Sequence, residues 1–121
     1  MDVLIVEDAP EVRSAYGRVL EHAGYMVKAV DNGLAALAEV QQGHYSVIVL
    51  DIFMPFLEGK GFFRQLEVDF PEMTKKVLFV TGMAGDSDTR DFLEQTGQPV
   101  LKKPIDAEQL VEAVRKMTGE Q

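Results

Sequence analysis

Four short apolar runs in this sequence are each followed, within two residues, by residues that can do chemistry. These are a pair of carboxylates, a single carboxylate, a hydroxyl beside a glycine, and an ammonium beside a proline: Glu7-Asp8, Asp51, Thr81-Gly82 and Lys103-Pro104. Three carboxylates held together repel one another unless a cation joins them, and ligation by oxygen alone suits a hard ion such as Mg²⁺. A carboxylate beside Mg²⁺, with a lysine and a hydroxyl nearby, is a setting for phosphoryl transfer to an aspartate.

Each of these residues also has a purely structural interpretation. The acidic pair Glu7-Asp8 could begin a helix, because acids near a helix N-terminus favour its dipole. Thr81-Gly82 could be an ordinary turn, and Lys103 could be a solvated lysine like its neighbour Lys102. Asp51 is different, since it stands between four apolar residues and Ile-Phe-Met, where an unpartnered acid costs several kcal/mol. Asp51 therefore argues most strongly for a functional site.

The apolar runs predict the strands that position these residues. Residues 3–6, 47–50 and 77–80 are apolar without alternation, a pattern typical of strands covered on both faces. Residues 26–30 and 100–101 are weaker versions of the same pattern, as expected for strands nearer the edge of a sheet. The sequence therefore predicts five strands.

Apolar residues spaced by three and four predict a helix after every strand. The first begins near Pro10, the second lies between Asn32 and Gly43, and the third ends before Pro71. A short, loosely held helix covers residues 89–96, and the last begins at a capping box formed by Asp106 and Gln109. Five β-α units predict an α/β fold, a (βα)5 three-layer sandwich around a five-stranded parallel sheet. Ligands of such sheets bind at the carboxyl ends of the strands, where the strand order reverses.

Composition narrows the range of functions. The chain has 121 residues and 13.5 kDa, which predicts one domain over residues 1–121 with a polar, frayed tail at 118–121. A net charge of −8 argues against nucleic acid and anionic lipid as partners. The absence of cysteine excludes disulfides and thiolate metal sites. With no apolar leader and no apolar run of membrane-spanning length, we expect a cytoplasmic protein.

Taken in order along the chain, these motifs resemble the receiver domain of two-component response regulators over essentially the whole length. The residues that carry the resemblance are Glu7-Asp8, Asp51 with Met54-Pro55 and Gly59, Thr81-Gly82, and Leu101 with Lys103-Pro104. The resemblance implies a flavodoxin-like sheet with strand order 2-1-3-4-5. It also implies a phosphoryl-accepting signalling switch, not a conventional enzyme, which catalyses only its own phosphorylation and dephosphorylation.

The resemblance also implies a role for each site residue. Asp51 would accept a phosphoryl group from the phosphohistidine of a histidine kinase or phosphotransfer protein. Mg²⁺ would be held by Glu7, Asp8, Asp51 and the backbone carbonyl of Phe53. The phosphoryl group would be contacted by Thr81, Gly82 and Lys103. Lys102 would point away, and the Lys103–Pro104 peptide bond would be cis.

The sequence departs from the family pattern at three positions. Val100 stands where the family usually has an aromatic residue that moves inward on activation. Phe53 and Met83 are bulky and apolar where polar residues are common, and both border the path of a water that would attack the phosphoryl group. We therefore expect slow self-dephosphorylation. The short segment 97–100 resembles that of receiver domains attached to hybrid histidine kinases.

Three other functions remain open at this point. An aspartyl-phosphate phosphatase would want a second acid two residues after its nucleophile, where this chain has Phe53. A flavin-binding domain would want a Ser-, Thr- or Gly-rich first loop, whereas residues 7–11 carry three acids that repel a phosphate. A receiver-like domain that only binds other proteins would not need the acceptor residues that this chain has.

Overall fold

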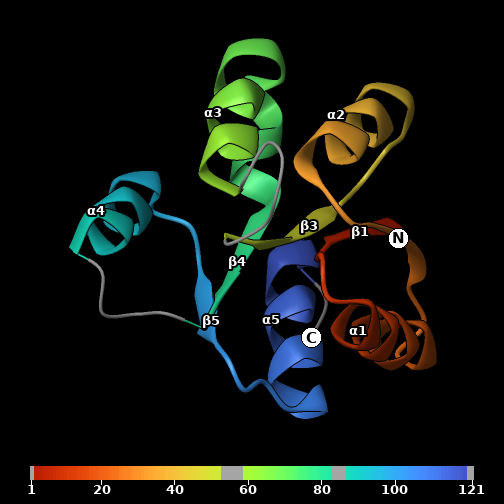
Figure 1. Ribbon diagram of the computed structural model, residues 1–121. Coiled ribbons are helices and arrows are strands. Elements are labelled where there is room, and N and C mark those ends of the chain that lie inside the picture. The colour runs from red at the N-terminus through yellow and green to blue at the C-terminus, as the bar shows by residue number, and fades with distance from the viewer. Residues whose placement is uncertain (1, 53–58, 83–86, 120–121) are drawn as a thin grey trace.

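The computed structural model describes residues 2–52, 59–82 and 87–119 (Figure 1). Strands and helices alternate along this part of the chain. The strands are β1 (Asp2–Val6), β2 (Met26–Val30), β3 (Val47–Asp51), β4 (Val77–Thr81) and β5 (Val100–Lys102). The helices are α1 (Pro10–His22), α2 (Gly33–Gln42), α3 (Gly59–Asp69), α4 (Ser87–Thr96) and α5 (Ala107–Thr118), with a 3-10 helix η1 (Pro71–Lys76) between α3 and β4.

The five strands form one parallel sheet in the order β2-β1-β3-β4-β5. This order confirms the predicted topology, with the two weaker apolar runs at the edges as β2 and β5. Its reversal point lies between β1 and β3, where Val6 pairs with Leu50. The chain therefore leaves these two neighbouring strands at the same edge of the sheet.

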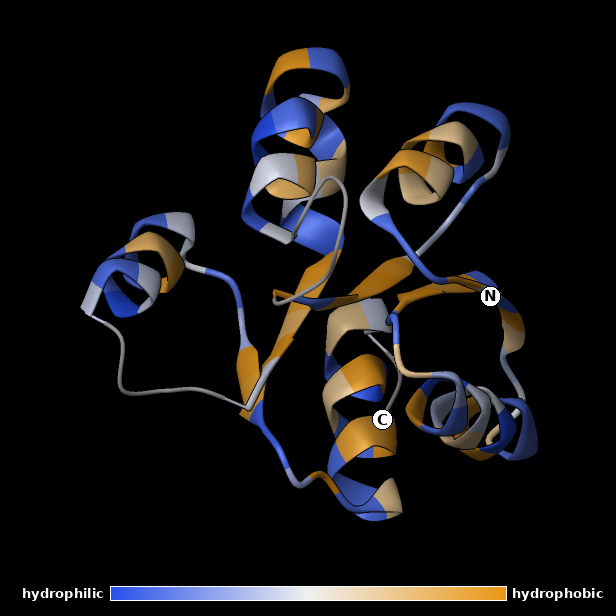
Figure 2. Cartoon of the chain, in the orientation of Figure 1, coloured by the Kyte–Doolittle hydropathy of each residue, from blue (hydrophilic) through white to orange (hydrophobic). Residues whose placement is uncertain are grey.

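Helices cover both faces of the sheet. Figure 1 shows α1 and α5 on one face and α2 and α3 on the other. Because side chains alternate along a strand, each central strand contributes to two separate cores. One core lies under α1 and α5 and includes Ile5 and Val49, while the other lies under α2 and α3 and includes Leu50 and Phe79. In Figure 2 the strands are mostly orange, the colour of hydrophobic residues.

Local capping explains where several helices begin. The Asn32 side chain accepts a hydrogen bond from the Ala35 amide at 2.8 Å, which fixes the start of α2. Asp106 and Gln109 form the predicted capping box at the start of α5, with each side chain accepting from the backbone amide of the other residue. Pro10 stands at the first position of α1, where its missing N–H costs nothing.

Helix α4 packs against the rest of the molecule through the buried ring of Phe92. Phe92 is buried, and its ring centroid lies 5.7 Å from that of Phe63 on α3 and 5.8 Å from that of Phe79 on β4. Lys60 and Arg64 of α3 lie over the same ring at 6.0 and 5.5 Å. Figure 1 shows α4 beside the β5 edge, apart from α1 and α2. This matches the short, thinly apolar helix that the sequence predicts.

Two details differ from the sequence-based expectation. The segment after α3 forms the 3-10 helix η1, whereas the sequence predicts only that the helix ends at Pro71. Thr118, placed in a frayed tail, is the last residue of α5, and its hydroxyl donates to the Arg115 carbonyl at 3.0 Å. Gly119 then ends the helix in the left-handed conformation, with φ of 79°. None of the described helices is long and apolar enough to cross a membrane.

Candidate functional site

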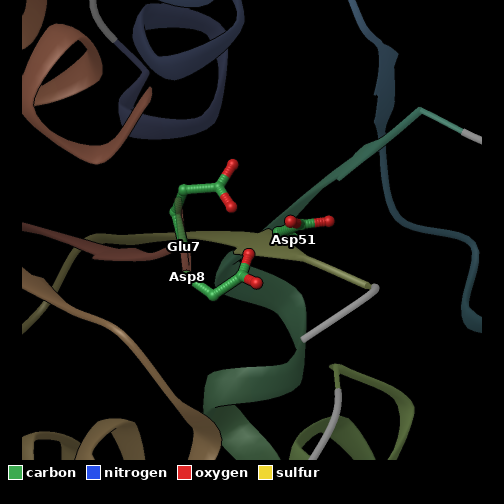
Figure 3. A group of neighbouring side chains, drawn as sticks. All are labelled: Glu7, Asp8 and Asp51. Atoms are coloured by element: carbon green, nitrogen blue, oxygen red, sulfur yellow. The ribbon is translucent and has the colours of Figure 1, made fainter. Parts of the chain in front are cut away.

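The carboxyl ends of the neighbouring strands β1 and β3 bring three acidic residues together. Asp51 is the last residue of β3, and Glu7 directly follows β1, where its amide donates to the Val30 carbonyl at 3.1 Å. Figure 3 shows Glu7 and Asp8 pointing to different sides of the chain, with Asp51 across from them. Oxygens of all three carboxylates lie within 4.8 Å of one another. The structure thus brings together the three predicted side-chain ligands.

The acids differ in exposure. Glu7 and Asp51 are only 1% and 5% exposed, whereas Asp8 is exposed. Partial burial raises the pKa of Asp8, and the hydrogen bond to Glu7 and the charge of Glu7 raise it further. Three carboxylates within reach of one another, with oxygen as the only donor atom, fit Mg²⁺. The fourth predicted ligand, the carbonyl of Phe53, lies outside the described residues, as does Met83.

Lys103 directly follows the edge strand β5, and its side chain reaches the acids at the ends of β1 and β3. Its Nζ atom donates to Glu7 Oε1 at 2.8 Å and to Asp51 Oδ2 at 3.4 Å. Burial by itself lowers the pKa of Lys103, but the hydrogen bond to Glu7 and the charges of Asp51 and Glu7 outweigh it, so the pKa is raised. The ammonium is therefore charged at neutral pH and bridges two buried carboxylates.

The backbone around Lys103 directs its side chain across β4. The Lys103 amide donates to the Thr81 carbonyl at 2.8 Å, which continues the pairing of β4 and β5 by one residue. The Lys103–Pro104 peptide bond is cis, as expected, and Lys102 is exposed, also as expected. Gly82 lies against the lysine stem, since a Cβ on Gly82 would be 3.7 Å from Lys103 Cδ.

Thr81 and Gly82 complete the set of predicted residues. Thr81 is the last residue of β4 and is buried, and Gly82 follows it on the surface. Strand β4 is the neighbour of β3, with Val80 paired to Asp51. The strand ends of β1, β3, β4 and β5 therefore converge on one edge, where acids, a hydroxyl, a backbone amide and an ammonium can act on one ligand.

Arg13 belongs to the site although the sequence analysis did not identify it. Its Nη1 atom donates to the Glu7 carbonyl at 3.0 Å and to the Asp8 carbonyl at 3.4 Å. It thereby fixes the backbone that carries both acids. The sequence contains one indication of this role, the position of Arg13 in the first turn of α1. A positive charge near a helix N-terminus interacts unfavourably with the helix dipole, so an arginine there suggests a separate binding partner.

Gly59 supports the site through close backbone packing. Its amide donates to the Ile52 carbonyl at 3.0 Å. A Cβ at this position would lie 2.5 Å from Ile52 Cα and 2.7 Å from the Asp51 carbonyl oxygen. Only glycine allows the start of α3 to approach the end of β3 this closely.

Comparison with known protein sequences identifies the family to which the chain is similar. Residues 3–115 match the response regulator receiver domain family. The chain is 32% identical over 115 residues to the response regulator receiver protein CpdR of Brucella abortus, covering 95% of this chain and 94% of CpdR. It is also 32% identical over 121 residues to the sensor kinase CckA of the same organism, covering 98% of this chain but only 13% of CckA.

A solved structure shows the same fold. The CheY-like response regulator receiver domain protein from Methanospirillum hungatei superposes with a TM-score of 0.88 at 24% identity, covering 98% of this chain and 93% of that chain. The family match, the sheet order and the converging strand ends all point the same way. The chain belongs to the response regulator receiver domain family of two-component signalling.

Proposed function

We propose that this chain is a phosphorylation switch in which Asp51 accepts a phosphoryl group from the phosphohistidine of a histidine kinase or phosphotransfer protein. The observation that carries the proposal is the bridge made by Lys103, whose ammonium lies 2.8 Å from Glu7 and 3.4 Å from Asp51. A buried aspartate held beside a charged lysine at the edge of a parallel sheet can attack an anionic phosphoryl group whose oxygens the lysine neutralises.

The transfer exchanges one bond to phosphorus for another. A carboxylate oxygen of Asp51 forms a P–O bond while the P–N bond to the donor imidazole breaks, and the nitrogen leaves with its electron pair. Lys103 turns toward the transferred oxygens, where the Thr81 hydroxyl and the Gly82 N–H also donate. Glu7, Asp8, Asp51 and the Phe53 carbonyl would hold Mg²⁺, which supplies further positive charge to the phosphoryl oxygens.

The proposal is tested by incubating the protein with acetyl phosphate and Mg²⁺ and measuring its intact mass. We expect the wild type to gain one phosphoryl group and Asp51→Asn to gain none. Asp31→Asn is the matched control, because it makes the same chemical change just after the edge strand β2. A gain in Asp51→Asn equal to that of the wild type would exclude Asp51 as the acceptor.

A further inference from the structure

The chain bends at Asp8, between the end of β1 and the start of α1. In an extended strand, successive side chains point to opposite faces, so neighbouring residues do not face the same ligand. Here oxygens of Glu7, Asp8 and Asp51 all lie within 4.8 Å of one another. Figure 3 shows the Glu7 and Asp8 side chains leaving the chain in different directions, with both carboxyl groups turned toward Asp51. The bend therefore lets two consecutive residues serve one cation.

The residues next to the bend do little to hold it. Ala9 is the N-cap of α1 and has no side chain that could accept from the first amides of the helix. Its own amide makes only a long hydrogen bond, 3.4 Å, to Glu7 Oε2. Pro10 has no N–H to offer. The two carboxylates also repel each other across the bend, so a group from outside this segment has to keep it closed.

Arg13 is such a group. A single guanidinium nitrogen, Nη1, donates to the Glu7 carbonyl at 3.0 Å and to the Asp8 carbonyl at 3.4 Å. Successive carbonyls of an extended strand point to opposite sides, so one nitrogen can reach both only where the chain turns between them. The Arg13 amide also donates to the Ala9 carbonyl at 2.9 Å. The arginine is thus anchored to the same segment that it holds.

We propose that Arg13 is a positioning residue for the cation site, and that its two hydrogen bonds hold the bend that turns the Glu7 and Asp8 carboxylates toward one ion. The inference rests on the proposed function for the identity of the ion, Mg²⁺, but not for the bend itself. A guanidinium is also positive, so its charge alone would weaken the binding of a cation nearby. Positioning and charge therefore predict opposite effects when the arginine is removed.

The effect on the ion is measured by isothermal titration calorimetry. We expect Arg13→Met to raise the Mg²⁺ dissociation constant about tenfold, the scale of losing an outer partner of a metal ligand. Arg18→Met is the matched control, since it removes the same charge from an exposed position on α1, and it should not raise the constant. Mg²⁺ demands stricter geometry than Ca²⁺, so the Ca²⁺ dissociation constant of Arg13→Met should rise less. Where Arg13→Met does not fold, Arg13→Gln takes its place.

The bend itself is tested without any metal. Glu7-Asp8 is the only Glu-Asp pair in the sequence, so ¹³C at glutamate carbonyls and ¹⁵N at aspartate amides give one cross-peak in a carbonyl–amide NMR correlation spectrum. This cross-peak reports the Glu7 carbonyl that accepts from Arg13. We expect the carbonyl resonance to move upfield in Arg13→Met and to stay in place in Arg18→Met. An unchanged cross-peak in a folded Arg13 variant overturns the proposal.

The possible failures are distinguishable. A wild type that binds no Mg²⁺ contradicts the metal site of the proposed function, and the NMR cross-peak then decides on the bend alone. A dissociation constant of Arg13→Met equal to or below that of the wild type overturns the positioning role, because the lost charge then accounts for the result. Equal losses of Mg²⁺ and Ca²⁺ affinity overturn it as well, because that pattern indicates general disturbance of the site.

Discussion

At the scale of single residues, glycine at two neighbouring places in the site has two different roles. A Cβ at Gly59 would meet backbone atoms at 2.5 to 2.9 Å, whereas one at Gly82 would make ordinary contact with the Lys103 side chain at 3.7 Å. We expect Gly59→Ala to lower the free energy of unfolding by about 1–3 kcal/mol, although alanine is the better helix former at this start of α3. Gly82→Ala should change it by no more than about 0.5 kcal/mol.

Urea unfolding of the two variants beside the wild type makes this comparison. Equal stability of both variants would mean that the chain relaxes around a methyl group at position 59, and that close backbone approach does not explain the glycine.

The acidic cluster should cost stability in the absence of a cation. The pKa of the Asp8 carboxyl is raised in the folded state from the value near 3.8 that it has in the unfolded chain. The folded state therefore binds a proton on Asp8 more tightly than the unfolded state does. The stability contributed by the protonated acid is present below 3.8 and is lost as pH rises through the folded pKa. We therefore expect Asp8→Asn to match the wild type at pH 3 and to be more stable at pH 7, by about 0.2–1 kcal/mol because Asp8 is exposed to screening.

Unfolding by urea across this pH range gives the difference directly. Glu67→Gln is the control, since it removes the same charge from an exposed position on α3. The same gain at pH 7 in Glu67→Gln would assign the effect to the net charge of −8 instead of the cluster.

The residues that sequence analysis found and missed differ in how they reach the site. Asp51, Glu7 and Lys103 were predictable because the carboxyl ends of parallel strands meet at one edge whatever the packing details. Arg13 reaches the site from a helix, and its hydrogen bonds to the Glu7 and Asp8 carbonyls depend on how α1 lies on the sheet. That placement results from tertiary packing, which no local pattern encodes.

At the scale of elements, α4 should open more easily than its neighbours, since Phe92 supplies most of its anchoring. We expect α4 amides to be less protected from hydrogen exchange than β3 amides, and Phe92→Ala to lower α4 protection about a hundredfold further, the cost of losing a buried ring. Asp91→Ala, which changes the adjacent exposed residue, should leave α4 protection unchanged. Equal protection of α4 and β3 amides in the wild type would mean that α4 opens only when the whole domain unfolds.

The strands were easier to predict than the connections between them. Unbroken apolar runs fix β1, β3 and β4 because both faces of each strand are covered. The 3-10 helix η1 was missed because six residues with one buried side chain, Met73, carry no helical periodicity. The Thr118 boundary was missed because residues 118–121 were taken as one polar tail, although a glycine such as Gly119 is a typical residue just after a helix.

At the scale of the whole molecule, the proposed cation site connects the neighbouring strands β1 and β3. Its carboxylates directly follow β1 and end β3, so a bound ion would stabilise the folded sheet and not only a loop. We expect Mg²⁺ at a hundred times its dissociation constant to raise the free energy of unfolding by about 2.7 kcal/mol. The same concentration should stabilise Asp8→Asn less, at matched ionic strength. Equal stabilisation of both proteins would show that Mg²⁺ acts by general screening.

The bridge between Lys103 and Glu7 joins residues 96 positions apart. A ribosome making this chain therefore releases Glu7 and Asp8, and later Asp51, long before it adds the lysine that completes the candidate site. Unfinished or C-terminally clipped chains would display an acidic cluster without its counter-charge. A chain therefore has the complete set of candidate site groups only after it is translated through β5 and β5 has paired with β4.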